Sequence, residues 1–146
     1  MKLKVAIASD HAGVELKSHL IQTLTDVDWV DLGPNTSERV DYPDFAKKVA
    51  QAVSQGGTPF GVLICGSGIG MSIAANKIKG IRAALIENPL SARLSRQHND
   101  ANIICLGERL IGKDMALECV NVFLKTPFQN GRHADRVQKI STLENP

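Results

Sequence analysis

The fold of this chain is clearest in the segment Gly61-Val62-Leu63-Ile64-Cys65-Gly66-Ser67-Gly68-Ile69-Gly70-Met71. Its first half, Gly61–Cys65, is a short apolar run that predicts a buried strand. The glycine-rich half that follows, Gly66–Gly70, predicts a tight turn leading into a helix that begins near Met71. A buried strand that passes through a turn into a helix is the repeating unit of a parallel sheet covered by helices.

The rest of the chain repeats this alternation of short apolar runs and segments of helical period. We expect five strands, at Leu3–Ser9, Trp29–Leu32, Gly61–Cys65, Arg82–Ile86 and Asn102–Leu106. We expect helices at Ala12–Thr25, Pro43–Ser54, Met71–Ile78, Pro89–His98, Lys113–Lys125 and His133–Ile140. The predicted fold is therefore α/β: one three-layer, Rossmann-like domain over residues 1–146, with a mainly parallel five-stranded sheet and helices on both faces.

Composition narrows the class of protein. The 146 residues are enough for one domain, and no apolar run exceeds four residues, which excludes a membrane-spanning helix. The 17 basic and 15 acidic residues give a net charge of +2, too small for a protein that binds nucleic acid regardless of sequence. The three cysteines cannot all pair and form no C-x-x-C motif, so we expect a protein of the reducing cytoplasm.

The small basic excess lies in the last third of the chain. Residues 1–90 carry nine basic and nine acidic residues, whereas residues 91–146 carry eight basic and six acidic ones. Two of these basic residues, Arg132 and Arg136, are four positions apart and share a helix face. Two arginines placed in this way can bind one phosphate group through both guanidinium groups. Alternatively, they are two solvated surface residues that bind no ligand.

Ligands bind to open α/β sheets just outside the carboxyl ends of the strands. In this sequence, polar residues and glycines directly follow four of the predicted strands. Ser9-Asp10-His11 follows the first strand, Cys65–Gly70 the third, Glu87-Asn88 the fourth and Gly107-Glu108-Arg109 the fifth. The glycines of the Cys65–Gly70 turn let backbone N–H groups converge on a ligand oxygen, so this turn predicts an oxyanion site. A tight turn without a ligand is the alternative.

Three familiar anion-binding loops are excluded by residue identity. Met71 stands where a dinucleotide-binding loop starting at Gly66 needs its third glycine. The same residue stands where a phosphatase loop starting at Cys65 needs arginine, and the G-K-[ST] signature of a phosphate-binding loop is absent. The glycine-rich turn therefore belongs to none of these three classes of loop.

The cysteines divide by position. A buried cysteine usually packs as a small apolar group, and we expect this of Cys105 and Cys119. Cys65 instead ends a strand directly before a helix, and the N-terminus of a helix favours the thiolate form. Cys65 is thus a candidate base or nucleophile beside the predicted oxyanion site, with simple core packing as the alternative.

Several segments together carry a family resemblance: Ser9-Asp10-His11-Ala12-Gly13, Asp41-Tyr42-Pro43-Asp44, Cys65–Gly70 with Ala74-Ala75-Asn76-Lys77, Ser95-Arg96-Gln97-His98-Asn99, and Gly131-Arg132-His133 with Arg136. In this order and at this spacing they resemble the type B ribose 5-phosphate isomerases. The wider family includes allose and galactose 6-phosphate isomerases. The resemblance extends over nearly the whole chain, although each segment alone is a weak signal.

The resemblance implies an enzyme without metal or cofactor that interconverts D-ribose 5-phosphate and D-ribulose 5-phosphate through an enediolate, in the non-oxidative pentose phosphate pathway. It implies that His98 protonates the ring oxygen of the closed sugar, with Asp10 as helper. Cys65 then moves the proton between C2 and C1. The Ser67 hydroxyl and the backbone of the turn stabilise the enediolate. The residues of that turn are Gly66, Gly68, Ile69 and Gly70.

The same resemblance assigns the remaining contacts to the sugar phosphate. The phosphate ligands that it implies are His11, Arg109, Arg132 and Arg136. Tyr42 and Asn99 contact the sugar. Some members of the family have a glutamate base at the position of Met71, so this chain resembles the branch that uses the cysteine. The family builds its site between two subunits, which implies a homodimer or a dimer of dimers.

Two other functions stay open on the residues alone. An allose or galactose 6-phosphate isomerase would use the same phosphate ligands for a substrate one carbon longer. A non-catalytic module that binds a phosphate ligand on a flavodoxin-like fold is the alternative from another class. Receiver modules of that fold need a carboxylate where Cys65 stands and a lysine after the fifth strand, where this chain has Gly107-Glu108-Arg109.

Overall fold

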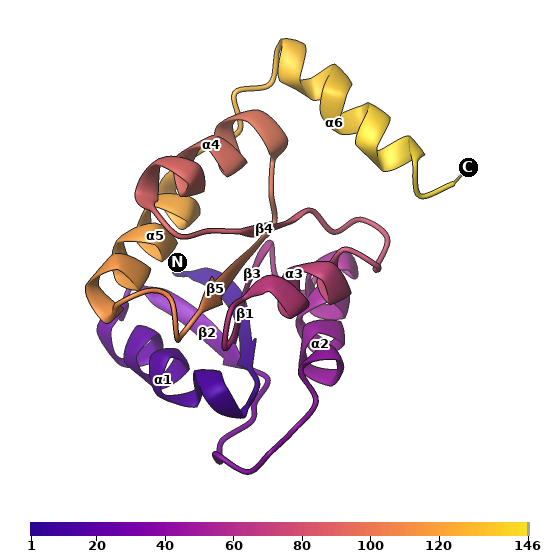
Figure 1. Ribbon diagram of the computed structural model, residues 1–146. Coiled ribbons are helices and arrows are strands. Elements are labelled where there is room, and N and C mark those ends of the chain that lie inside the picture. Colours follow the sequence, from indigo (N-terminus) through magenta and orange to yellow (C-terminus); the bar gives the residue numbers. More distant parts are fainter. Residues whose placement is uncertain (146) are drawn as a thin grey trace.

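The alternation of strands and helices produces one five-stranded sheet in the computed structural model, which describes residues 1–145 (Figure 1). The strands are β1 (Leu3–Ser9), β2 (Val27–Asp31), β3 (Phe60–Cys65), β4 (Ala83–Leu85) and β5 (Ile103–Gly107). The helices are the short 3-10 helix η1 (His11–Gly13) and α1 (Val14–Thr23), α2 (Tyr42–Ser54), α3 (Ile69–Ala75), α4 (Pro89–Asn99), α5 (Lys113–Lys125) and α6 (Arg132–Thr142). The predicted α/β class is confirmed. Pro146, the last residue of the expected domain, lies outside the described residues.

The order of the strands in the sheet locates the point where a ligand is expected. The order is β2-β1-β3-β5-β4, and every pair of neighbours is parallel. The chain leaves β1 toward the edge strand β2 and then returns to the other side of β1 as β3. Between β1 and β3 the connections therefore diverge in opposite directions, which opens a crevice outside the carboxyl ends of these two strands.

Side chains alternate between the two faces of the sheet, as the period of a strand requires. On β3, Val62 and Ile64 enter the core that packs against α1, α4 and α5. Leu63 and Cys65 enter the other core, which packs against α2 and α3. The predicted helices on both faces are thus confirmed, and the Cys65 side chain lies on the side of α2 and α3.

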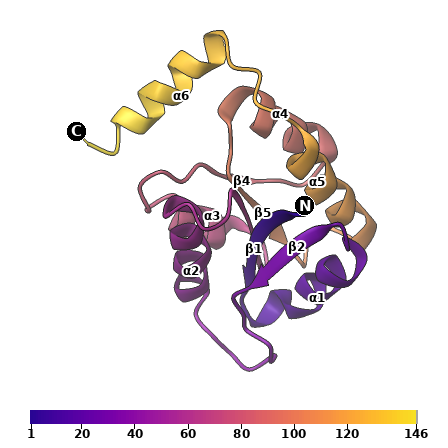
Figure 2. The same cartoon turned by 180° about the vertical axis from the view of Figure 1, so that it is seen from behind.

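The last helix lies outside this three-layer arrangement. Figures 1 and 2 show α6 beyond α4, away from the sheet. Its only buried residue is His133, whereas the apolar Ile140 and the following Leu143 stay exposed. Within residues 1–145, no helix is long and apolar enough to span a membrane.

Element boundaries differ from the prediction where local hydrogen bonds decide them. The helix after the glycine-rich turn begins at Ile69, two residues before the expected Met71, because Gly68 takes a left-handed conformation (φ +77°) at its N-cap. The segment expected to be helical from Ala12 begins one residue earlier as η1, where the Asp10 carboxylate accepts the Ala12 amide. Strand β4 is shorter than expected, with three residues.

Candidate active site

A pocket of about 510 Å³ opens at the carboxyl ends of β1 and β3, where the strand order places a crevice. Most of the expected site residues line it: Asp10, His11, Tyr42, Cys65, Gly66, Ser67, Ile69, Gly70 and Arg109. Three residues that were not expected, Ala12, Ile73 and Leu110, complete the wall. The fold thus brings together polar groups that lie up to 99 positions apart in the sequence.

Cys65 lies in the wall of this pocket, at the end of β3. Its side chain is 5% exposed, and its Sγ atom lies 3.1 Å from the Gly68 amide, which donates a hydrogen bond to it. Gly68 is suited to this position because its φ is +77° and because a Cβ there would lie 2.8 Å from the Leu106 carbonyl carbon. The thiolate is the form of a cysteine that acts as a base.

The other two thiols lie in different surroundings. Burial, and secondarily the neighbouring Cys65, raises the pKa of the Cys105 thiol far above its ordinary value. Burial, with a smaller effect of Glu118, raises the pKa of Cys119 to about 11. Both side chains are fully buried, and neither lines the pocket. These positions agree with the prediction that Cys105 and Cys119 are core residues.

The glycine-rich turn supplies hydrogen-bond donors beside Cys65. The Ser67 hydroxyl accepts a hydrogen bond of 3.2 Å from the Ile69 amide, so the side chain is held over the start of α3. The first intrahelical bond of α3 runs from the Ser72 amide to the Gly68 carbonyl. The amide of Gly70, in the first turn, therefore has no acceptor within the helix and is available to a ligand oxygen.

Asp10 and His11 stand at the opposite wall, at the end of β1. The Asp10 carboxylate is buried and accepts the Ala12 amide at 2.9 Å, which fixes its orientation. The Nδ1 atom of His11 accepts the Val40 amide at 3.3 Å. Because Nδ1 is the acceptor, the neutral His11 ring carries its proton on Nε2. The ring of Tyr42 closes this side, close enough to Gly70 that a Cβ there would lie 2.5 Å from Cε1.

Backbone hydrogen bonds at the end of β5 hold Arg109 next to the glycine-rich turn. The Glu108 amide donates to the Cys65 carbonyl at 2.9 Å, and the Arg109 amide donates to the Gly66 carbonyl at 3.0 Å. These bonds place the Arg109 guanidinium beside Gly66. The Glu108 carboxylate turns away and accepts the Leu16 amide at the start of α1, and burial raises its pKa.

Not all of the expected site residues lie in this pocket. Gly68 lies behind it, with its amide directed at the Cys65 sulfur. His98 and Asn99 end α4, and Arg132 and Arg136 lie on α6, so these four are separate from the pocket. They form a second group, in which the His98 ring stacks on the ring of His133 at a centroid distance of 4.3 Å.

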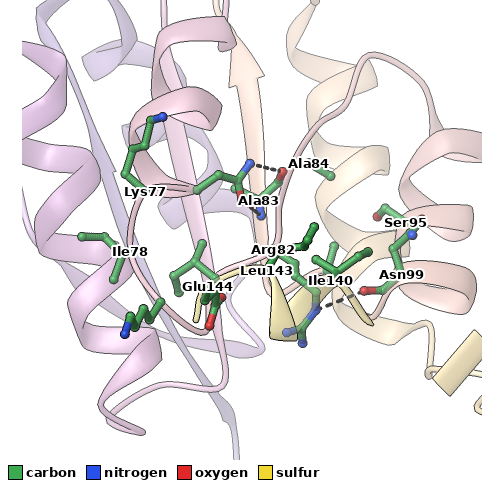
Figure 3. Close-up of a pocket in the computed structure, with 14 residues that line it drawn as sticks. Lys77, Ile78, Arg82, Ala83, Ala84, Ser95, Asn99, Ile140, Leu143 and Glu144 are labelled. Atoms are coloured by element: carbon green, nitrogen blue, oxygen red, sulfur yellow. Dashed lines mark hydrogen bonds between the residues drawn. The ribbon is translucent and has the colours of Figure 1, made fainter. Parts of the chain in front are cut away.

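A larger cavity, of about 610 Å³, lies elsewhere, between α6, the end of α4 and the segment that leads into β4 (Figure 3). Figure 3 shows Ile140 and Leu143 between Ile78 and Asn99, with Arg82 donating a hydrogen bond to the Asn99 carbonyl. Of the expected site residues, Asn99 alone lines this cavity. This larger cavity contains neither Cys65 nor Asp10, the two groups to which the family resemblance assigns proton transfer.

The profile of the family described as Ribose/Galactose Isomerase matches residues 5–140. The chain belongs to this family. The resemblance seen in the sequence motifs is thereby confirmed. Among residues 1–145, the ribose/galactose isomerase fold brings together no group of three or more His, Cys, Asp or Glu side chains that could hold a metal ion.

Relatives within the ribose/galactose isomerase family match this chain over almost its full length. The putative sugar phosphate isomerase YwlF of Bacillus subtilis is 48% identical, with 97% of both chains covered. Ribose-5-phosphate isomerase B of Escherichia coli is 45% identical, with 97% of this chain and 96% of that protein covered.

Solved structures of the family share the fold. The ribose-5-phosphate isomerase B of Clostridium thermocellum has a TM-score of 0.95 and 51% identity, with 97% of both chains covered. The ribose-5-phosphate isomerase B of Mycoplasma genitalium, solved with bound ribulose-5-phosphate, has a TM-score of 0.93 and 42% identity. That comparison covers 99% of this chain and 97% of the other.

Three residues make contacts that the sequence did not predict. Val40 acts through its backbone amide, which no side-chain pattern marks. Glu108 stands at a predicted strand end, but only the structure shows that it caps α1 rather than facing the pocket. His133 belongs to a segment of the family resemblance, yet its stacking on His98 joins positions 35 residues apart.

Proposed function

We propose that this protein is a ribose 5-phosphate isomerase, which interconverts D-ribose 5-phosphate and D-ribulose 5-phosphate. The observation that carries the proposal is the Cys65 thiol, which accepts the Gly68 amide in a pocket that also holds Asp10 and Arg109. The relatives named ribose-5-phosphate isomerase B, one of them solved with ribulose-5-phosphate, favour this five-carbon substrate over the six-carbon ones.

The reaction begins with a closed sugar ring. His98 donates a proton to the ring oxygen, and Asp10 accepts the proton of the hydroxyl group on C1. The bond between C1 and the ring oxygen then breaks, and C1 becomes an aldehyde. The Asp10 carboxylate is prepared for this role because the Ala12 amide already fixes its orientation.

Proton transfer follows between C2 and C1. The Cys65 thiolate takes the proton from C2, and the electron pair of the broken C–H bond forms the double bond of an enediolate. The negative charge that develops on the C1 oxygen lies toward the Ser67 hydroxyl and the free amide of Gly70. Cys65 then returns the proton to C1, the proton on the C2 oxygen moves to the C1 oxygen, and the ketose is formed.

The phosphate group lies at the wall formed by His11 and Arg109. His11 presents Nε2–H, because its Nδ1 atom is occupied by the Val40 amide. Arg109 supplies a guanidinium group that hydrogen-bonds phosphate through two N–H groups at once. Arg132 and Arg136, one turn apart on α6, add two further positive charges that bind the phosphate group. Tyr42 and Asn99 contact the sugar.

Two copies of the chain assemble the complete site. His98, Asn99, Arg132 and Arg136 are separate from the pocket of their own chain, so a second copy supplies them. Exposed apolar side chains lie in the wall of the pocket and, separately, on α4, which supports contacts between copies at these two places. They are Ile69, Ile73, Leu110, Leu90 and Leu94. The minimal active unit is therefore a homodimer.

This chemistry needs no metal, since the oxyanion donors and the base are protein groups. It does need a reduced Cys65 thiol, and the three free cysteines support a protein of the cytoplasm.

The experiment that tests the proposal offers ribose 5-phosphate, allose 6-phosphate and galactose 6-phosphate to purified protein treated with a chelator. We expect ketose formation from ribose 5-phosphate with the highest kcat/KM. Turnover of none of the three would refute the isomerase function, and a preference for a six-carbon sugar would reassign the substrate.

A matched pair of variants tests the base. Cys65→Ala should lower kcat by about 100-fold or more, the typical contribution of a base, with little change in substrate binding. Cys119→Ala, on the opposite face of the sheet, should retain wild-type turnover. A Cys65→Ala protein that keeps a tenth of the wild-type turnover would show that the base is another group.

A further inference from the structure

The histidine that follows Arg132 has an unusual place in its helix. His133 is the only buried residue of α6, with 8% of its surface exposed, whereas even the apolar Ile140 of this helix is exposed. The turn that precedes it is tied to α4, because the Gln129 amide donates to the Gln97 carbonyl at 3.1 Å. The His133 amide in turn donates to the Asn130 carbonyl at 3.1 Å. The backbone thus holds His133 next to the last turn of α4.

The contact that results is a flat stack of two imidazole rings. The His133 and His98 centroids are 4.3 Å apart, and the ring planes differ by 13°. Across residues 1–145, no side-chain or backbone hydrogen bond is found to the ring nitrogens of His98. Stacking, rather than hydrogen bonding, therefore sets the plane of the His98 ring and leaves both nitrogens available.

We propose that His133 is a positioning residue for proton transfer: its buried ring lies flat against His98 and fixes the plane in which His98 presents its proton to the sugar. This inference rests on the proposed isomerase function, in which His98 protonates the ring oxygen. A misplacement of about 1 Å in a reacting group lowers a rate by about 100-fold, so an oriented ring matters for the rate.

The charges around the stack assign different roles to its two rings. Two stacked imidazolium rings would repel each other, so one ring must stay neutral for the other to carry a proton. Burial lowers the pKa of His133, and the positive charges of His98 on α4 and of Arg132 and Arg136 on α6 lower it further. His133 is therefore the neutral platform, and His98 is the ring that takes up and donates the proton.

Two substitutions of His133 test whether its aromatic stacking on His98, and not only the volume of its side chain, is needed for the reaction. His133→Phe keeps a flat ring against His98, whereas His133→Leu keeps an apolar side chain without the stack. We expect His133→Phe to retain kcat for ribose 5-phosphate within about threefold, and His133→Leu to lower kcat by about 10-fold to 100-fold with little change in KM. Gln138→Ala, on the exposed side of α6, is the matched control and should match the wild type.

A second measurement does not depend on activity. In proton NMR spectra, the ring current of an aromatic neighbour shifts the ring protons of His98 upfield in the wild type and in His133→Phe, and this shift should disappear in His133→Leu. The absence of such a shift in the wild type would overturn the proposal, whether or not the leucine variant folds.

The kinetic outcomes that contradict the proposal are equally distinct. An unchanged kcat in His133→Leu, or an equal loss in both variants, would show that stacking does not matter. A rise in KM of about tenfold with unchanged kcat would make His133 a phosphate ligand instead. If the wild type does not turn over ribose 5-phosphate, the proposed function itself is refuted. If the wild type and His133→Leu both turn it over at the same rate, only the role of His133 is refuted.

Discussion

Cys65 differs from the other two thiols of the chain in its contacts rather than in its depth. All three side chains are buried, yet Cys65 alone lines the pocket and accepts a backbone amide at sulfur. The thiolate is the nucleophilic form of cysteine, so a Cys65 that removes a proton in the proposed reaction is also expected to react with alkylating agents. The raised pKa values of Cys105 and Cys119 keep those two thiols protonated near neutral pH.

We therefore predict that iodoacetamide at pH 7.5 modifies Cys65 at least about tenfold faster than Cys105 or Cys119 in the folded protein. Activity should fall in step with the modification of Cys65, and inorganic phosphate or ribose 5-phosphate should slow both. Peptide mass spectrometry at successive times measures the three rates. Equal rates at all three cysteines would contradict the difference in environment that the structure shows.

His133 makes the stability of the fold depend on pH. Burial, and then the charges of His98, Arg132 and Arg136, lower the pKa of His133 from its ordinary value of 6.5. As the pH falls below about 6.5, the unfolded chain takes up a proton at His133, whereas the folded protein does so only at lower pH. The unfolded state then binds more protons at this position, so the free energy of unfolding decreases as the pH falls.

The prediction is that His133→Phe loses less stability than the wild type between pH 7.5 and pH 5.5. Urea denaturation of both proteins at each pH measures the free energies of unfolding. Titrating groups outside the His98–His133 stack act equally in the two proteins, so the difference between the slopes reports the replacement of His133 in this stack. Identical slopes would mean that His133 protonates as readily in the folded protein as in the unfolded chain.

At the scale of elements, the end of β5 and the glycine-rich turn after β3 depend on close backbone contact. A Cβ at Gly107 would lie 2.5 Å from the Ser67 carbonyl carbon and oxygen. These are backbone atoms of the turn, so the contact is not relieved by rotating a side chain. Any side chain at position 107 must therefore displace Ser67, and with it the amides that face the pocket.

Gly107→Ala should accordingly lower kcat by about tenfold or more through this displacement, and should reduce stability by about 1 to 3 kcal/mol through overpacking. The matched control is Gly112→Ala, because nothing lies within 4 Å of a Cβ at Gly112. Steady-state kinetics and urea denaturation of the two variants give both quantities. Equal behaviour of the variants would show that the turn and β5 are not packed as closely as this.

The elements differ in how far the sequence predicts them. Strands β1, β3 and β5 were predicted nearly to the residue, because their side chains are buried on both faces and form continuous apolar runs. The glycine-rich turn was predicted as well, because glycine adopts the positive φ that tight turns require, as Gly68 does here (φ +77°). The residues that meet at the carboxyl ends of these strands followed from the parallel arrangement alone.

What the sequence does not predict arises from contacts between distant segments. Lys17 is an example: a lysine on a helix is ordinarily expected at the surface, yet it is 1% exposed. Its ammonium group donates to the Asp31 carboxylate and to the Pro34 carbonyl, both at 2.7 Å. This contact joins α1 to the segment after β2, which later carries Val40 to the ring of His11. Such pairings depend on the packed fold and leave no local pattern.

At the scale of the whole molecule, the proposed site residues divide between two regions of one chain. Cys65, Asp10 and Arg109 share the pocket at the switch point of the sheet, whereas His98 and Arg132 lie on α4 and α6. A site that uses both groups requires either a large movement of α4 and α6 or a second copy of the chain. The exposed apolar side chains beside the pocket favour the second copy.

A mixture of two inactive variants distinguishes these arrangements. Cys65→Ala and His98→Asn, combined under conditions in which subunits exchange, form mixed dimers as about half of all dimers. If each site takes Cys65 from one copy and His98 from the other, a mixed dimer contains one site with both substitutions and one intact site. Activity should then recover to about a quarter of the wild-type value, and an assay of the mixture against each variant alone measures it.

The control for this experiment pairs Cys65→Ala with Asp10→Asn. Both residues line the same pocket, so no mixed dimer of these variants contains an intact site, and activity should stay at the level of the separate variants. Recovery in the first mixture together with no recovery in the second identifies a site shared between copies. If neither mixture recovers although subunits have exchanged, each chain completes its own site, and α4 and α6 must then move toward the pocket when substrate binds.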